Sequence, residues 1–133
     1  MTAALLIDRV RDGAIGPGDF GHREHLQAAW ELLRNRPFLA AAAHYGDTID
    51  TFATRAGAGD KYSVTITLAF LSLVAERLAG SQALSFDAFL AANADLARTP
   101  LSAWYSKRRL DDPLARRVFL MPDRAPAPGD RAA

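Results

Sequence analysis

The sequence predicts an all-α domain, a compact bundle of three main helices followed by short C-terminal helices. Apolar residues recur at helical spacing in three long segments, at about 20–35, 38–55 and 61–78. Turn residues separate these segments, and no alternation of apolar and polar residues is long enough to form a sheet. With 133 residues, half of them hydrophobic, the chain has the size and apolar content of one folded domain.

A short helical segment within residues 1–14 opens the chain, and glycines and a proline at 13–18 end it. Asp19 is the expected cap of a helix over about residues 20–35. On that helix His22, His25 and Leu26 fall on one stripe, whereas the charged residues fall mostly on the opposite side. We therefore expect both histidines to face inward.

Pro37 suits the first turn of a second long helix, which runs from Phe38 to about Arg55. Gly57 is expected to end it in a left-handed conformation. The third segment, at about 61–78, begins with β-branched residues but is too long for a strand. Because it is apolar nearly all round, we expect it to be the central helix, in which Leu68→Ala costs about 2 to 5 kcal/mol.

Shorter helices are expected in the C-terminal third. Ser85 caps a helix through Ala92, a second piece at about 100–105 contains Trp104 and Tyr105, and Pro113 begins a last helix that runs to about Met121. From residue 122 the chain contains only Pro, Ala, Gly, Asp and Arg, a composition that cannot bury itself. The expected organisation is one helical domain over residues 1–121 and a disordered tail over residues 122–133.

Composition narrows the classes of partner and location. The 16 Lys and Arg residues nearly balance the 15 Asp and Glu residues, so no long-range attraction to nucleic acid or to an anionic membrane is expected. The most apolar stretch, at 64–75, is too short to span a bilayer. The absence of cysteine excludes disulfides and thiolate metal sites. No export signal is evident, so we expect a cytoplasmic protein. We expect its partner to be a small molecule.

The strongest chemical signal is the pair His22 and His25, three residues apart on one helical face. At this spacing two imidazoles can share a metal ion or a substrate. A catalytic zinc normally takes three protein ligands, and no third ligand is evident on that face. Three interpretations stay open: structural imidazoles, an acid–base or substrate-binding pair, and ligands of a divalent metal cofactor.

The expected topology places other polar groups near this pair. If the three long helices run up, down and up, the first turns of the first and third lie at the same end of the bundle. That end gathers two imidazoles, an ammonium, a phenol and a hydroxyl. The candidate catalytic residues are therefore His22, His25, Lys61 and Tyr62. The candidate substrate-binding residues are Thr65, Trp30 and Tyr105.

Several motifs resemble those of a family of small bacterial proteins without a settled function. The motifs are Phe20-Gly-His22-Arg-Glu-His25-Leu and Lys61-Tyr62-Ser63-Val-Thr65, followed by Tyr105-Ser106 and Ala115-Arg-Arg-Val-Phe119-Leu-Met-Pro122-Asp. The family pattern is Phe-x-His-x-x-His-Leu with Lys-Tyr-His-x-Thr, and the resemblance covers about residues 20–123. This chain has Ser63 where the pattern has a third histidine, so the three-histidine site that the resemblance implies is incomplete here.

Two functional hypotheses follow. The leading one is a small helical enzyme that acts on a small molecule at one end of the bundle, with His22 or His25 as general base. The alternative is a non-catalytic ligand-binding or interaction module with structural histidines, able to form a homodimer through exposed aromatic residues such as Trp104. A solvent-reachable cavity lined by both imidazoles and Tyr62 favours the enzyme, whereas imidazoles sealed against carbonyls favour the module.

Overall fold

The computed structural model describes residues 5–98 and 100–124, and within these ranges every regular element is a helix. The α-helices are α1 Leu6–Arg11, α2 His22–Asn35, α3 Phe38–Arg55, α4 Val64–Ala79, α5 Phe86–Ala92 and α6 Lys107–Leu110. Short 3₁₀ turns lie between them: η1 Pro17–Asp19, η2 Gly59–Lys61, η3 Ala94–Ala97, η4 Pro100–Ala103 and η5 Pro113–Arg116. The predicted all-α class is confirmed.

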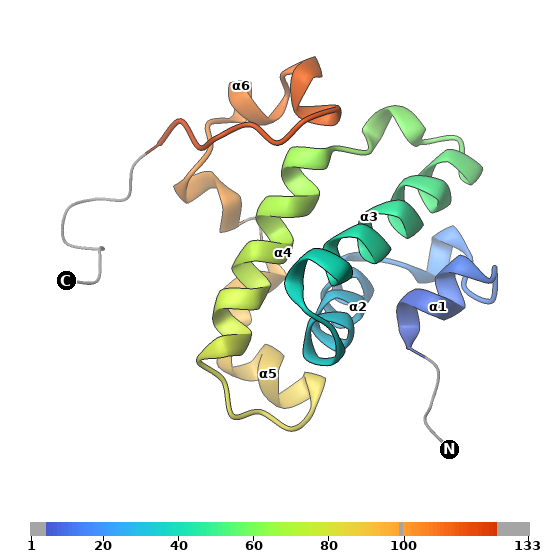
Figure 1. The fold of residues 1–133 in the computed structure, drawn as a ribbon, viewed down its shortest axis with the longest axis vertical. Coiled ribbons are helices and arrows are strands. Elements are labelled where there is room, and N and C mark those ends of the chain that lie inside the picture. Colours follow the sequence, from blue (N-terminus) through green and yellow to red (C-terminus); the bar gives the residue numbers. More distant parts are fainter. Residues whose placement is uncertain (1–4, 99, 125–133) are drawn as a thin grey trace.

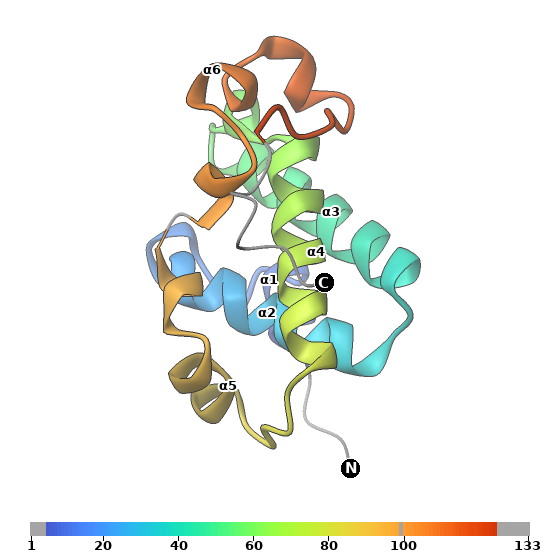
Figure 2. The ribbon, with the colours of Figure 1, turned by 90° about the vertical axis from the view of Figure 1, so that its left-hand side faces the viewer.

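Helices α2, α3 and α4 pack against one another and form the centre of the molecule (Figure 1). Helix α1 lies against α2 and α3. Figure 2 shows α3 on one side of α4 and the segment that carries α5 and α6 on the other. Helix α4 is central as expected, but it shares this position with α2, because α2 also contacts α5 and η3 while α4 contacts η4 and η5.

Helix α2 begins at His22, two residues later than the first residue expected. Its cap is Gly21, whose backbone N–H donates to Glu24 Oε1 at 2.9 Å. Asp19, the predicted cap, lies in the preceding turn η1. The side chain of Glu24 thus satisfies a free N–H at the helix start, a task that Asp19 is too far back to perform.

Helix α4 also begins later than predicted, at Val64. The hydroxyl of Ser63 accepts a hydrogen bond from the Ile66 N–H at 3.2 Å and caps the helix. The same hydroxyl donates to the Ala115 carbonyl at 3.1 Å. Lys61 and Tyr62 consequently lie in the connection before α4 rather than in its first turn.

The apolar surface of α4 is not evenly buried. Leu71, Leu73 and Val74 are buried, and Leu68 is partly buried against the core. Ile66 remains 40% exposed. The sequence pattern identified the helix but overestimated how completely its neighbours surround it. In the described part of the chain, no helix has the length and apolar character needed to cross a membrane.

The prediction of a last helix extending to Met121 is wrong. Helical structure ends at Arg116, and the chain then runs non-helically beside the first turns of α4. Thr65 provides the physical reason, since its hydroxyl donates to the Val118 carbonyl at 2.7 Å and accepts from the Leu120 N–H at 2.9 Å. These two bonds satisfy backbone groups that a continuing helix would have paired internally.

Packed contacts also continue beyond the domain boundary expected at residue 121. Asp123 accepts hydrogen bonds from the Ser106 N–H at 2.8 Å and from the Ser106 hydroxyl at 2.6 Å. The Arg124 N–H donates to the Trp104 carbonyl at 2.9 Å. The rest of the expected tail, residues 125–133, lies outside the described residues.

Candidate functional site

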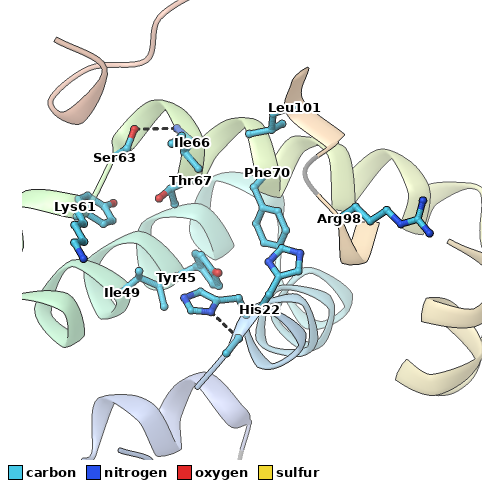
Figure 3. Close-up of a pocket in the computed structure, with 13 residues that line it drawn as sticks. His22, Tyr45, Ile49, Lys61, Ser63, Ile66, Thr67, Phe70, Arg98 and Leu101 are labelled. Atoms are coloured by element: carbon cyan, nitrogen blue, oxygen red, sulfur yellow. Dashed lines mark hydrogen bonds between the residues drawn. The ribbon is translucent and has the colours of Figure 1, made fainter. Parts of the chain in front are cut away.

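A cavity of about 460 Å³ opens between α2, α3 and the start of α4, a volume suited to a small molecule (Figure 3). The predicted catalytic residues His22, His25, Lys61 and Tyr62 all line it. The other lining residues are Gly21, Tyr45, Ile49, Ser63, Ile66, Thr67, Phe70, Arg98 and Leu101. The structure therefore brings the four residues together, as the up–down–up topology predicted.

His25 is held in one tautomer by the helix start. Its Nδ1 lies 2.8 Å from the Gly21 carbonyl oxygen, which also accepts the His25 backbone N–H at 3.0 Å. A carbonyl oxygen only accepts, so the proton of the neutral ring is on Nδ1 and the lone pair is on Nε2. Within the described residues, no protein group hydrogen-bonds to this Nε2.

The surroundings of His25 favour its neutral form. Its ring packs against Phe20, with ring centroids 4.2 Å apart. Burial lowers the pKa of His25 below its usual value of 6.5, the nearby His22 lowers it further, and the hydrogen bond to Gly21 opposes the shift. At neutral pH the ring can therefore accept a proton at Nε2.

His22 has a different role in the fold. Its Nε2 lies 2.8 Å from the Leu96 carbonyl oxygen in η3, which fixes the proton on Nε2. This bond connects the first residue of α2 to a segment more than seventy positions further along the chain. The ring also lies near Phe70, at a centroid distance of 6.1 Å. His22 thus fastens two elements together while it lines the cavity.

Two phenols line the same cavity. Tyr45, on α3, is 2% exposed, and burial together with the nearby Tyr62 raises its pKa strongly. Burial also raises the pKa of Tyr62, while a hydrogen bond with Thr67 lowers it and the carboxylates of α3 raise it. A Cβ added at Gly46 would lie 3.1 Å from the Tyr62 hydroxyl oxygen, so this phenol rests against α3 beside Tyr45.

The rest of the wall is mostly apolar. The side chains of Ile49, Ile66, Phe70 and Leu101 face the cavity together with the aromatic rings. Lys61 is exposed, which places its ammonium at the rim. Figure 3 shows the guanidinium of Arg98 extending away from the other lining side chains.

Three predicted substrate-binding residues do not reach this cavity. Thr65 is fully buried, and its hydroxyl holds the C-terminal segment through Val118 and Leu120, as described above. Its stripe of α4 faces residues 118–120, whereas the stripe with Ile66 and Phe70 meets the histidines.

Trp30 and Tyr105 also have other surroundings. Trp30 is buried beside Phe86 and Phe89, at ring centroid distances of 5.9 and 6.2 Å. The Tyr105 hydroxyl donates to the Leu120 carbonyl at 2.9 Å. Tyr105 lines a second, smaller cavity together with Trp104. Trp104 is partly buried against the core, so it is not the exposed aromatic residue that the interaction hypothesis expected.

A divalent metal ion finds an incomplete donor set here. The free lone pairs are Nδ1 of His22 and Nε2 of His25, which supply two of the three protein ligands that a catalytic zinc normally takes. No group of three or more His, Cys, Asp or Glu side chains able to hold a metal occurs among residues 5–98 and 100–124. Ser63, at the position of the third histidine in the resembled pattern, is committed to capping α4.

The sequence analysis did not identify four residues of the cavity wall as site residues: Tyr45, Ile49, Thr67 and Phe70. The periodicity of residues 38–55 places Tyr45 and Ile49 on the inward stripe, but this signal does not separate a core position from a cavity wall. Arg98 and Leu101 carry no local signal, because only the path of the chain after α5 brings them here.

Comparisons with protein-family models, with curated proteins and with solved structures give no match for this chain. The resemblance to the small bacterial family therefore stays a prediction from the motifs.

Proposed function

We propose that this protein is an enzyme that acts on a small molecule in the cavity, with His25 as the general base. The observation that carries the proposal is the hydrogen bond from His25 Nδ1 to the Gly21 carbonyl, which leaves Nε2 as the proton acceptor. Burial supports it, because the lowered pKa of His25 keeps the ring neutral at physiological pH.

The alternative is a ligand-binding or interaction module in which both histidines are structural. Each ring donates to a backbone carbonyl, as a structural imidazole does. The two bonds differ in what they hold in place. The His22 bond to Leu96 joins two segments that are far apart in the sequence, which is a structural role, whereas the His25 bond reaches only the Gly21 carbonyl at the start of its own helix. We therefore assign catalysis to His25.

Ring opening of a nitrobenzisoxazole tests the general base without requiring the natural substrate. A base removes the ring C–H proton, the C–H electrons form the nitrile, and the ring N–O bond breaks to release a coloured phenolate. General-base catalysis typically contributes about a hundredfold or more, so we expect His25→Gln to lose acceleration of that order. The rate of the unchanged protein should fall as the pH is lowered through the depressed pKa of His25.

His44→Gln is the matched control, because His44 lies outside the cavity between Asp8 and Arg36, at 3.0 and 3.3 Å. It should retain the rate of the unchanged protein. Equal rates for the unchanged protein and His25→Gln would reject the general base and favour the binding module.

A further inference from the structure

The cavity contains a polar group that general-base catalysis by His25 does not explain. Tyr45 lines the cavity and is 2% exposed, yet within the described residues its hydroxyl makes no hydrogen bond. Figure 3 shows its phenol oxygen among the lining side chains, between Ile49 and His22. Among the described residues the only fully enclosed side-chain polar atom without a partner is Trp30 Nε1, so the Tyr45 hydroxyl oxygen keeps contact with the cavity. A donor that the protein leaves unpaired at a cavity wall is available to a ligand.

Resting on the proposed function, we propose that the substrate is a carbonyl compound with an apolar body, whose oxygen Tyr45 binds while His25 removes a proton from the neighbouring carbon. The hydroxyl of Tyr45 is the donor that remains free for this oxygen. His25, whose Nε2 carries the lone pair of the neutral ring, lines the same cavity. One wall thus offers a hydrogen-bond donor and another offers a base.

The electrostatic setting of Tyr45 suits a donor that stays protonated. Burial and the neighbouring Tyr62 both raise its pKa, so the phenol keeps its proton throughout the physiological range. A neutral donor in an apolar wall stabilises negative charge that develops on a substrate oxygen more strongly than water does. The same apolar surroundings disfavour the binding of a charged ligand that receives no hydrogen bond from such a donor.

Tyr62 supports the same end of the cavity. Its hydroxyl lies against α3 at Gly46, immediately after Tyr45 in the sequence. This contact positions a second phenol beside the first. The structure therefore groups two phenolic oxygens on the α3 side, whereas the imidazole of His25 comes from α2.

The remaining walls indicate the body of the substrate. Ile49, Ile66, Phe70 and Leu101 line the cavity, and its volume of about 460 Å³ accommodates a molecule with one small ring. The exposed Lys61 contributes a cation at the rim. A ketone with an aromatic or aliphatic body fits these walls better than a sugar, which would leave many hydroxyls without partners.

The proposed reaction uses only the side chains of His25 and Tyr45. His25 Nε2 takes the proton from the carbon next to the carbonyl, and the electrons of that C–H bond form a carbon–carbon double bond. The carbonyl π electrons move onto oxygen, where the Tyr45 O–H hydrogen-bonds to the enolate. The imidazolium then returns a proton to carbon, at the same position or at a conjugated one.

Binding of para-nitrophenolate tests the donor, because its oxygen resembles the enolate oxygen. Hydrogen bonds to charged groups correspond to affinity changes of about tenfold to a hundredfold, so we expect Tyr45→Phe to weaken para-nitrophenolate binding by that factor. Nitrobenzene lacks the phenolate oxygen, so its affinities for the unchanged protein and for Tyr45→Phe should agree within about threefold. Tyr105→Phe, which alters a buried tyrosine outside the cavity, should bind para-nitrophenolate as the unchanged protein does.

Deuterium exchange into phenylacetone in heavy water tests the proposed proton removal next to a carbonyl. We expect the unchanged protein to accelerate loss of the NMR signal of the protons next to the carbonyl, and both His25→Gln and Tyr45→Phe to lose that acceleration. If Tyr45→Phe keeps full exchange and full phenolate affinity, the carbonyl inference is overturned. A different result rejects the general base. In that case Tyr45→Phe loses both the exchange and the phenolate affinity, but His25→Gln opens nitrobenzisoxazole as fast as the unchanged protein.

Discussion

His22 and His25 carry the same side chain on the same helix, yet the fold gives them different chemistry. The His22 ring donates to the Leu96 carbonyl and connects α2 to η3. The His25 ring donates to the local Gly21 carbonyl and packs against Phe20, which removes it partly from water. The hydrogen bond to the Gly21 carbonyl fixes the tautomer, and among the described residues no protein group binds the second ring nitrogen. The two imidazoles therefore differ in what their hydrogen bonds hold in place, and burial lowers the pKa of His25.

The pH dependence of stability should report on His25. Because its folded-state pKa lies below the ordinary value of 6.5, the unfolded chain binds more protons between the two values, and stability rises with pH there. The contribution is complete above the unfolded pKa and is lost as the pH falls toward the lowered folded pKa. Urea unfolding at about pH 5 and about pH 7.5 measures this difference.

His25→Gln should reduce that pH dependence, since glutamine cannot take up the proton. The comparison uses the change in unfolding free energy between the two pH values and not its absolute size, so a general loss of stability in the variant does not affect it. Parallel pH profiles for the two proteins would contradict the buried, neutral state of the imidazole.

At the scale of the element, α4 shows how a pattern identifies a helix without assigning its faces. Residues 64–67 are all β-branched, and the length of the apolar segment correctly indicated a helix. The faces then meet three different neighbours: the core through Leu71 and Val74, residues 118–120 through Thr65, and the cavity through Ile66 and Phe70. Periodicity fixes which residues share a face, whereas packing decides what each face contacts.

Paired truncations on α4 test this assignment. Leu71 is fully buried, so Leu71→Ala should lower the free energy of unfolding by about 2 to 5 kcal/mol. Leu68 is only partly buried, and Leu68→Ala should cost clearly less than Leu71→Ala, in contrast to the expectation from sequence. Urea denaturation measures both values, and an equal or larger loss at Leu68 would mean that α4 is rotated relative to the structure described here.

At the scale of the whole molecule, side chains fasten the non-helical segment after η5 to the helices. Thr65 binds residues 118 and 120, Tyr105 binds the Leu120 carbonyl, and Arg109 donates to the Met121 carbonyl at 3.1 Å. Ser106 completes the attachment by donating to Asp123, and these bonds lower the pKa of that carboxyl. The segment thus closes one side of the bundle although it has no regular structure.

Truncation tests that attachment. A chain that ends after Met121 lacks the bonds from Ser106 to Asp123 and from Arg124 to Trp104, whereas a chain that ends after Arg124 retains them. We expect the shorter chain to melt several degrees lower, because thermal stability of a domain this size responds measurably to the loss of a few hydrogen bonds. Asp123→Asn in the longer chain is the control and should lower Tm only in part. Identical melting of the two truncated chains would show that the contacts contribute nothing.

The sequence by itself determined the helical class, the three long helices and the meeting of His22, His25, Lys61 and Tyr62 at one end. These features follow from periodicity, turn residues and short connections, all of which act over a few neighbouring positions. Only the tertiary structure decided the early end of the last helix, because the bonds that replace it come from a distant threonine.

Tertiary structure also decided which side chains belong to the cavity. Tyr45 and Trp30 both lie on inward faces, yet one lines the cavity and the other fills the core beside Phe86. The difference depends on how α2, α3 and α4 cross and on where the chain after α5 passes. Those crossings are set by the summed packing of many side chains, a property that no single stretch of the sequence contains.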